Sequence, residues 1–397
     1  MMRRVHFLLC AAVLVACTEP GAIGPDPDGP RQDSGTKPRP DAGDKPSTSP
    51  DARPGFDAGP GPRADASFDA GSSPDSGPGP IDDFGKRPGL AVYWGQNGYG
   101  GANPGNPALY EKSLAEVCQN PDYDIVILAF ATSFVSARNA DGLPELNFAF
   151  HCDTPYDQRN PFLLRCANIE AGIETCHSKG KKVLLSLGGA AGAYGFTSDA
   201  QAERFAETTW DMFLGGSGAV RPFGRAVLDG VDLDIEGGST IGYTAYVKKL
   251  RGLMSQDTTR SYYVAAAPQC PYPDAYVGPA PGRPLGDVPA MFDWLFVQFY
   301  NNYCNFNQRA SFEQSYAQWT SLATGGKPKI FVGLPATPQA ANAASFVGRA
   351  DLQALVDVTA KSKAFGGVML WDSSYDQNSS EGGQTYGALV ASLLRKL

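Results

Sequence analysis

Short runs of apolar residues alternate with longer amphipathic stretches along the chain from residue 88 onward. Each run is rich in Val, Ile, Leu, Phe or Tyr, which is typical of β-strands that are covered on both faces. The runs predict strands at 89–94, 124–130, 182–187, 226–235, 262–267, 294–300, 330–333 and 367–371. The stretches between them predict helices at 108–119, 169–179, 199–214, 243–255, 312–322 and 350–361. Strands that alternate with helices in this way over about 300 residues predict an α/β fold of the (β/α)8 TIM-barrel type.

A doubly wound open sheet is the alternative fold. Such a sheet usually carries a Gly-rich phosphate turn of the form GxGxxG after its first strand. The residues that follow the first predicted strand are Gly95-Gln96-Asn97-Gly98, which do not fit that form. We therefore favour the closed barrel.

The stretch before the predicted barrel has a different composition. Almost half of the chain's 32 prolines fall between residues 18 and 88, where Asp-Ala-Gly recurs and Leu, Ile and Val are scarce. Such a stretch cannot bury enough apolar surface to offset the entropy lost on ordering. We predict a disordered, extended Pro/Asp/Gly-rich linker at 18–87 and one folded domain at 88–397.

The first residues have the pattern of an export signal. Residues 1–4 are basic, and residues 5–15 form an apolar run that is too short to span a bilayer. The run ends in Leu14-Val15-Ala16-Cys17, which resembles a bacterial lipobox. We predict a lipoprotein signal peptide at 1–17, with Cys17 lipidated as the chain's membrane attachment, so that the protein is exported to the cell envelope or secreted. An ordinary secretory signal is the alternative.

Charge and histidine content exclude several classes of protein. The formal net charge is −8 and no segment is strongly basic, which argues against binding to nucleic acid. The chain has 3 His and no HExxH motif, so neither a His-rich metal site nor a Ser-His-Asp hydrolase is expected. We expect no metal, no cofactor and no partner protein, and a monomeric chain.

Acidic side chains are concentrated at the strand predicted at 226–235. Side chains alternate between the two faces of a strand, so Asp232, Asp234 and Glu236 share one face and the apolar residues between them share the other. In a barrel the apolar set packs against helices and the acids point inward. Buried carboxylates cost several kcal/mol per unpaired ion, so they share protons and have raised pKa values. A raised pKa at the carboxyl end of a barrel strand suits a general acid, whereas a cation site or an exposed edge strand is the alternative.

Seven segments in chain order resemble a known family. The sequence DGVDLDIE at 229–236 resembles the DxxDxDxE signature of glycoside hydrolase family 18. Six others resemble the plant-type class III, or hevamine-type, chitinases of that family: YWGQN at 93–97, SLGG at 186–189, AAPQCP at 266–271, VQFYNN at 297–302, GLP at 333–335 and GGVMLW at 366–371. The resemblance covers residues 88–397. It implies an endo-acting chitinase that hydrolyses β-1,4 bonds between N-acetylglucosamine units.

The resemblance implies a substrate-assisted, retaining mechanism in which the 2-acetamido oxygen of the substrate is the nucleophile. Glu236 is then the general acid that protonates the glycosidic oxygen and the base that activates water. Asp234 orients the acetamido group, and Asp232 partners Asp234 and shares its proton.

Four further residues belong to the site that the resemblance implies. Tyr300 hydrogen-bonds the acetamido oxygen as it attacks. Trp371 forms the floor of the subsite beside the scissile bond by stacking on the sugar, while Tyr93 and Gln298 line the same pocket. Substitution of the family's third Gly by Ala190 and a Pro- and Gly-rich loop at 272–289 bear on substrate length and preference.

Cysteine content fits an oxidising compartment. Of the 8 Cys, Cys10 lies in the leader and Cys17 is the predicted lipid site, and the even number that remains predicts disulfides of open pairing. The resemblance implies three pairs: Cys118 with Cys176, Cys152 with Cys166, and Cys270 with Cys304.

Three nearby residues are interpreted as structural. Asp229 has the opposite strand parity to the acidic file, Trp94 lies on the face alternate to Tyr93, and His151 is adjacent to a Cys of a predicted disulfide. Alternatives to chitin hydrolysis are a hydrolase of peptidoglycan or other N-acetylglucosamine glycans, and a non-catalytic chitin-binding lectin or inhibitor on the same barrel. A lectin of this kind typically loses the Glu or its Asp partner, and both are present here.

Overall fold

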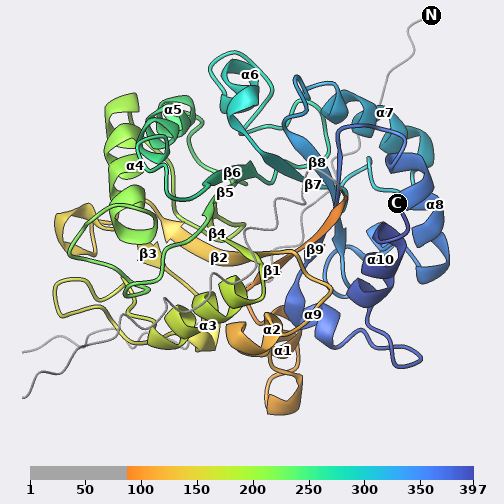
Figure 1. The fold of residues 1–397 in the computed structure, drawn as a ribbon, viewed down its shortest axis with the longest axis horizontal. Coiled ribbons are helices and arrows are strands. Elements are labelled where there is room, and N and C mark those ends of the chain that lie inside the picture. The colour runs from red at the N-terminus through yellow and green to blue at the C-terminus, as the bar shows by residue number, and fades with distance from the viewer. Residues whose placement is uncertain (1–86) are drawn as a thin grey trace, which may run out of the picture. The chain divides into compact units, whose positions relative to one another are not determined.

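The computed structural model describes residues 87–397, and the predicted strands form a closed parallel barrel in it (Figure 1). The 9-stranded sheet has the order β1-β9-β8-β7-β6-β5-β4-β2-β3, and a further parallel pairing of β1 with β2 closes it. The barrel strands are β1 (Gly89–Trp94), β2 (Ile125–Ser133), β4 (Lys182–Gly188), β5 (Gly230–Asp234), β6 (Tyr263–Ala266), β7 (Trp294–Gln298), β8 (Lys329–Pro335) and β9 (Phe365–Trp371). The predicted (β/α)8 TIM barrel is confirmed.

Two details of the sheet differ from the prediction. The strand predicted at 226–235 begins only at Gly230, which lies so close to Tyr263 of β6 that a Cβ atom would meet its carbonyl oxygen at 1.9 Å. The remaining strand, β3 (Glu145–Leu146), pairs antiparallel with the end of β2 and was not predicted. Two residues are too few to give a periodic signal.

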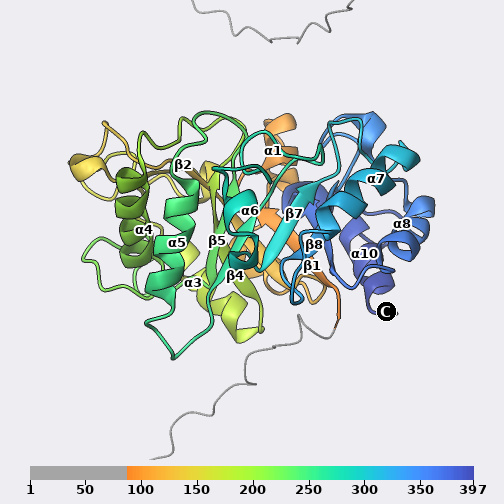
Figure 2. The ribbon, with the colours of Figure 1, turned by 90° about the horizontal axis from the view of Figure 1, so that it is seen from above.

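Helices surround the barrel as predicted at five places. They are α3 (Ala167–Ser178), α4 (Asp199–Phe213), α5 (Tyr243–Met254), α7 (Arg309–Thr320) and α8 (Leu352–Thr359). α4 illustrates the local cause, since the Ser198 side chain caps its first turn by accepting from the Gln201 amide, and its apolar face is buried against the barrel. Figure 2 shows α4 and α5 side by side on one flank, with α7 and α8 on the other.

The helix predicted at 108–119 is wrong. In its place the chain forms a 3-10 turn at Pro107–Leu109 and a one-turn helix, α2 (Leu114–Val117). Ser113 and Glu116 form a capping box that starts a helix at residue 114 and so ends the preceding segment. Helices that were not predicted are α1 (Gly98–Ala102), α6 (Pro284–Asp287), α9 (Ser373–Gln377) and α10 (Tyr386–Leu394).

The strands bury both faces. One apolar cluster lies inside the barrel and includes Tyr93, Ile127, Leu184 and Phe296, whereas alternate residues such as Val92 pack outward in the main core. This alternation places the inward residues of β5, Asp232 and Asp234, inside the barrel among apolar neighbours.

Three disulfides join the pairs that the resemblance implies, with Cα–Cα separations of 4.9 Å for Cys118–Cys176, 5.5 Å for Cys152–Cys166 and 5.9 Å for Cys270–Cys304. The predicted signal peptide at 1–17, its lipid site Cys17 and nearly all of the predicted linker lie outside the described residues. Within residues 87–397, no helix combines the length and the apolar character that crossing a membrane requires.

Candidate active site

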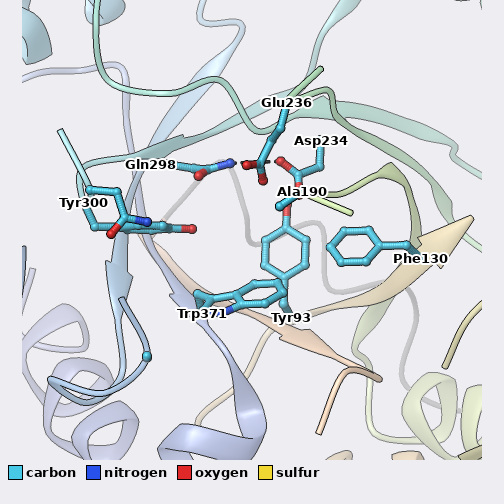
Figure 3. A pocket seen from close by; sticks show the side chains of 10 residues that line it. Tyr93, Phe130, Ala190, Asp234, Glu236, Gln298, Tyr300 and Trp371 are labelled. Atoms are coloured by element: carbon cyan, nitrogen blue, oxygen red, sulfur yellow. Dashed lines mark hydrogen bonds between the residues drawn. The ribbon is translucent and has the colours of Figure 1, made fainter. Parts of the chain in front are cut away.

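A pocket with a volume of about 160 Å³ opens at the carboxyl ends of the barrel strands (Figure 3). This is the end at which barrel enzymes carry their active sites. The structure brings six of the predicted residues together in its wall: Tyr93, Asp234, Glu236, Gln298, Tyr300 and Trp371. Four other residues complete the wall of the pocket: Phe130, Ala190, Asn301 and Ala340. None of them was predicted as a site residue, although Ala190 was noted as a departure from the family.

Asp232 lies beneath the pocket and is 0% exposed. Its Oδ2 accepts hydrogen bonds from the Tyr93 hydroxyl and the Ser186 hydroxyl, both at 2.7 Å, whereas its Oδ1 has no hydrogen-bond partner. Burial raises the pKa of Asp232 to about 6, although both hydroxyl contacts act in the opposite direction. Asp232 is therefore a carboxyl that takes up a proton readily.

Asp234 lies one inward position further along β5, at the floor of the pocket. The Gln298 amide donates to its Oδ1 at 2.9 Å, and the same amide nitrogen donates to the Ala267 carbonyl at 3.1 Å. Burial raises the pKa of Asp234 well above its usual value, and the charges of Glu236 and Asp232 raise it further. The structure shows Asp234 bonded to Gln298 rather than to Asp232.

Glu236 follows the end of β5 and points into the pocket beside Asp234 (Figure 3). Burial raises the pKa of Glu236, and hydrogen bonds to Gln298 and Asp234 partly offset that effect. Its backbone is held by Tyr194, whose hydroxyl accepts from the Glu236 amide at 2.8 Å and donates to the Gly189 carbonyl at 2.9 Å. The carboxyl at the pocket mouth is thus both protonatable and fixed, as a general acid requires.

Asp274 is a further acid near the site that the sequence did not single out. It is buried in the loop after β6, where it accepts from the backbone amides of Gln269, Tyr276 and Val277 at 2.8 to 3.1 Å. Its charge raises the pKa values of Asp234 and Glu236. The predicted loop at 272–289 therefore contributes charge to the site.

Aromatic rings form one side of the pocket. The Trp371 indole lies 5.5 Å from the Tyr93 ring and 6.0 Å from the Phe130 ring, and it stacks on Phe130 at an interplanar angle of 20°. Phe130 was missed because it reads as one more core residue at the end of an apolar strand. Flat rings of this kind suit the apolar face of a sugar ring.

Tyr300 projects its hydroxyl toward the acids from the end of β7 (Figure 3). Burial raises its pKa well above the usual value, and the charges of Asp234 and Glu236 act in the same direction. Tyr300 therefore keeps its proton and is available as a hydrogen-bond donor in the pocket.

The residues interpreted as structural lie outside the pocket. Trp94 is 1% exposed in the main core and donates from its indole nitrogen to the Lys112 carbonyl at 2.9 Å. Asp229 accepts from the Val183 amide and contacts His177, and His151 is buried beside the Cys152 disulfide. Among residues 87–397, no cluster of three or more His, Cys, Asp or Glu side chains is arranged to hold a metal ion.

The family model described as glycosyl hydrolases family 18 matches residues 89–352. The acidic end of β5 and the inward Tyr93 lie within this match, whereas Trp371 lies after its end. The chain belongs to this glycoside hydrolase family.

Curated relatives carry the names of chitinases. Chitinase 2 of Candida albicans is 40% identical over 308 residues, which is 77% of this chain and 48% of that protein. The acidic endochitinase of Vitis vinifera is 37% identical over 298 residues, which is 73% of this chain and 88% of that protein. The chain spans about half the length of the first fungal relatives that it matches.

Solved structures with the same fold differ in what their names say. A chitinase from Ipomoea carnea is 34% identical with a TM-score of 0.63, and the match covers 77% of this chain and 99% of that one. A xylanase and α-amylase inhibitor from Scadoxus multiflorus is 30% identical with a TM-score of 0.61, over 77% and 98% of the two chains. Because an enzyme and an inhibitor share this fold, the side chains of the pocket and not the fold decide the activity.

Proposed function

We propose that this protein is an endo-acting chitinase that hydrolyses β-1,4 bonds between N-acetylglucosamine units. The observation that carries the proposal is the pair of adjacent carboxyls, buried Asp234 and half-buried Glu236, which face Tyr300 and the Trp371 ring in one pocket. The chitinase names of the curated relatives support the choice of substrate.

In the proposed mechanism the substrate supplies its own nucleophile. Protonated Glu236 gives its proton to the glycosidic oxygen as the bond from that oxygen to C1 breaks and the 2-acetamido oxygen bonds to C1. Water then attacks C1, the acetamido oxygen leaves, and the Glu236 carboxylate takes the proton of the water. Two displacements at C1 return the sugar to its original anomeric configuration.

The neighbouring groups position the acetamido group in this scheme. Asp234 faces the reacting centre with a raised pKa, so in its protonated form it hydrogen-bonds the acetamido group and orients it. Asp232 lies beneath Asp234 in the barrel, and its raised pKa lets it gain or lose a proton as Asp234 loses or gains one. The Tyr300 hydroxyl donates to the acetamido oxygen, and Trp371 supports the ring of the same sugar.

The inhibitor and lectin alternative depends on the loss of catalytic groups. This chain retains both Glu236 and Asp234, with the raised pKa values that acid catalysis needs. A preference for peptidoglycan or another N-acetylglucosamine glycan is the closer alternative, since the proposed chemistry acts on the same sugar.

We also propose the domain arrangement that the sequence predicts: a leader at 1–17, a linker at 18–87 and the catalytic barrel at 88–397. The three disulfides support export to an oxidising compartment. The family match begins at residue 89 and the first relatives are fungal, so the bacterial lipid anchor at Cys17 depends on the leader sequence alone. Replacement of Cys17 by Ala should release the protein from membranes, and unchanged fractionation would exclude the anchor.

The central test compares Glu236→Gln with the wild-type protein on N-acetylglucosamine oligosaccharides and on peptidoglycan. We expect kcat on the oligosaccharides to fall by about 10²- to 10⁴-fold, the range typical of a lost general acid, while oligosaccharide binding is retained. Glu116→Gln, in the exposed cap of α2, is the matched control. Wild-type protein that binds oligosaccharides without cleaving them would indicate the lectin or inhibitor function, and cleavage of peptidoglycan alone would redefine the substrate.

A further inference from the structure

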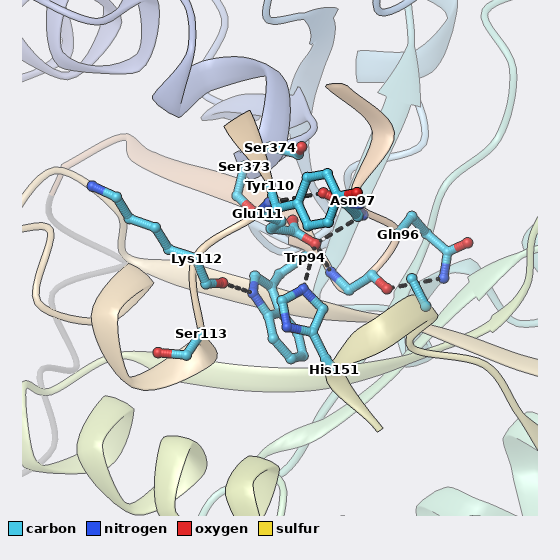
Figure 4. Close-up of polar contacts among 12 residues, drawn as sticks. Trp94, Gln96, Asn97, Tyr110, Glu111, Lys112, Ser113, His151, Ser373 and Ser374 are labelled. Carbon is cyan, nitrogen blue, oxygen red and sulfur yellow. Dashed lines mark hydrogen bonds and ion pairs between the residues drawn. The ribbon is translucent and has the colours of Figure 1, made fainter. Parts of the chain in front are cut away.

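Glu111 is a buried carboxylate that the proposed chemistry does not use (Figure 4). It lies in the segment between β1 and α2 and is 3% exposed. A buried carboxylate needs hydrogen-bond donors or a counter-charge, because its desolvation is otherwise unfavourable. The hydrogen-bond donors around Glu111 therefore show which segments of the chain this side chain joins.

Four donors from three separate loops converge on Glu111. Its Oε2 accepts from the backbone amides of Gly95 at 3.0 Å and Asn97 at 2.9 Å, and contacts His151 Nε2 at 3.0 Å. Its Oε1 accepts from the Ser373 hydroxyl. The segments after β1, β3 and β9 are thereby joined through one side chain.

The contacts on the β1 side fix the turn that follows Tyr93. Gly95 and Asn97 both have positive φ, and the Asn97 side chain returns a contact by accepting from the Glu111 amide at 2.8 Å. Between them, the Gln96 side chain points the other way and donates to the Ala129 carbonyl at 2.7 Å. The turn therefore connects Glu111 with Ala129 of β2, the residue before Phe130.

The contact on the β9 side fixes the segment that follows Trp371. Ser373 lies 262 positions after Glu111 and two residues after Trp371. Between Trp371 and Ser373, Asp372 caps α9 by accepting from the Tyr375 amide at 2.9 Å. The backbone that carries the Trp371 ring is thus held at α9 and at Glu111.

We propose that Glu111 is a positioning residue that sets the Tyr93 and Trp371 rings at the separation that the sugar needs. The inference rests on the proposed function, because it takes the pocket between these rings to be a sugar subsite. The two rings are 5.5 Å apart with planes at 56°, and each belongs to a strand whose following turn ends at the same carboxylate. A carboxylate suits this role because both of its oxygens only accept, whereas an amide presents donors to one side of the same site.

The test compares Glu111→Gln and Ser373→Ala with the matched control Glu116→Gln. We expect Glu111→Gln to raise KM for oligosaccharides about tenfold, with a smaller change in kcat, because a misplaced ring weakens binding before it affects proton transfer. Ser373→Ala removes one hydroxyl only and should raise KM by a smaller factor. In the double variant KM should rise by less than the product of the two single effects, because both changes act on one set of contacts.

Two further measurements separate positioning from stability and from the proposed function itself. Oligosaccharide affinity is measured in the Glu236→Gln background, where no turnover occurs. In ligand-free protein, the quenching of Trp371 fluorescence by acrylamide is measured. The contribution of Trp371 is the difference in fluorescence between each protein and the same protein with Trp371→Phe. We expect weaker binding and stronger quenching for Glu111→Gln and Ser373→Ala, and neither effect for Glu116→Gln.

Wild-type values of KM, oligosaccharide affinity and Trp371 quenching in both variants, with only the melting temperature lowered, would overturn the inference. A wild-type protein that fails to cleave chitin would overturn the proposed function instead. In that case the quenching of Trp371 still decides whether Glu111 positions the ring.

Discussion

Two groups of carboxyls in the described part of the chain, one inside the barrel and one outside it, differ in their surroundings. Inside the barrel, Asp232, Asp234 and Glu236 face one another along one line, and one oxygen of Asp232 has no partner at all. Outside it, Glu111 receives four donors, and its charge raises the pKa of a buried acid beside it, Asp372. Asp232, Asp234 and Glu111 are all buried to nearly the same degree, so burial alone does not say what a buried acid does.

The difference lies in the balance between donors and like charges. Burial raises the pKa values of the three inner acids, and neighbouring charges raise those of Asp234 and Glu236 further, so these groups hold protons. Such groups are able to give up and take back a proton during a reaction. A carboxylate surrounded by donors is instead a fixed acceptor, which joins the chain segments that carry those donors.

The largest effect expected within this comparison is on the chemistry of the inner set. Asp234→Asn should lower kcat on oligosaccharides by about 10²-fold or more, because the proposed orientation of the acetamido group is lost. Oligosaccharide affinity should change much less, in contrast to Glu111→Gln. Steady-state kinetics and titration calorimetry on both variants measure this contrast. Equal changes of kcat and of KM in Asp234→Asn and Glu111→Gln would contradict it.

The next effect is on the pH dependence of stability. The folded pKa of Asp232 is about 6 and its ordinary value is 3.8, so the folded state binds more protons between these pH values. Its contribution to stability is present below pH 4 and is lost as the pH rises through about 6, by about 3 kcal/mol in all. Asp234 and Glu236, with raised pKa values, act in the same direction.

Asp232→Asn should therefore make the fall in unfolding free energy with rising pH shallower without abolishing it. Urea titrations at a series of pH values from 4 to 7 measure this slope, with Glu116→Gln as the control. The same slope in Asp232→Asn and the wild-type protein would show that Asp232 is ionised in the folded state throughout this range.

The smallest effect expected is a difference in stability at neutral pH. Glu111→Gln should lower the unfolding free energy by about 1–3 kcal/mol, because at least one buried donor loses its acceptor. Asp232→Asn should be neutral or stabilising, since an amide oxygen still accepts from Tyr93 and Ser186 and a buried charge is removed. Glu116→Gln should change little, because Gln also completes a capping box. A stability loss for Asp232→Asn as large as that for Glu111→Gln would contradict the comparison.

The predicted strands and the acidic file depend on local information, which explains why they could be found. A strand that is buried on both faces is a run of apolar residues, and alternation along β5 assigns Asp232 and Asp234 to one face whatever the rest of the chain does. The helix predicted at 108–119, which the structure does not contain, shows where local information is insufficient. Its amphipathic pattern included Glu111, whose partner Ser373 lies 262 positions away.

The unpredicted part of the pocket has the same cause. Phe130 reads as the end of an apolar strand, and nothing beside it in sequence shows that it meets Trp371. Asp274 reads as one more turn residue of a Pro-rich loop, and it is its burial near Asp234 that gives it an electrostatic effect.

By itself, the sequence determined the order of strands and helices, the inward face of β5 and, through the family resemblance, the residues proposed for catalysis. Only the tertiary structure decided which buried acid has donors and which faces other acids, as it did for Glu111 and for Asp234. The physical reason is that strand parity is a property of neighbouring residues, whereas the surroundings of a carboxyl are set by groups from distant strands that meet when the barrel closes.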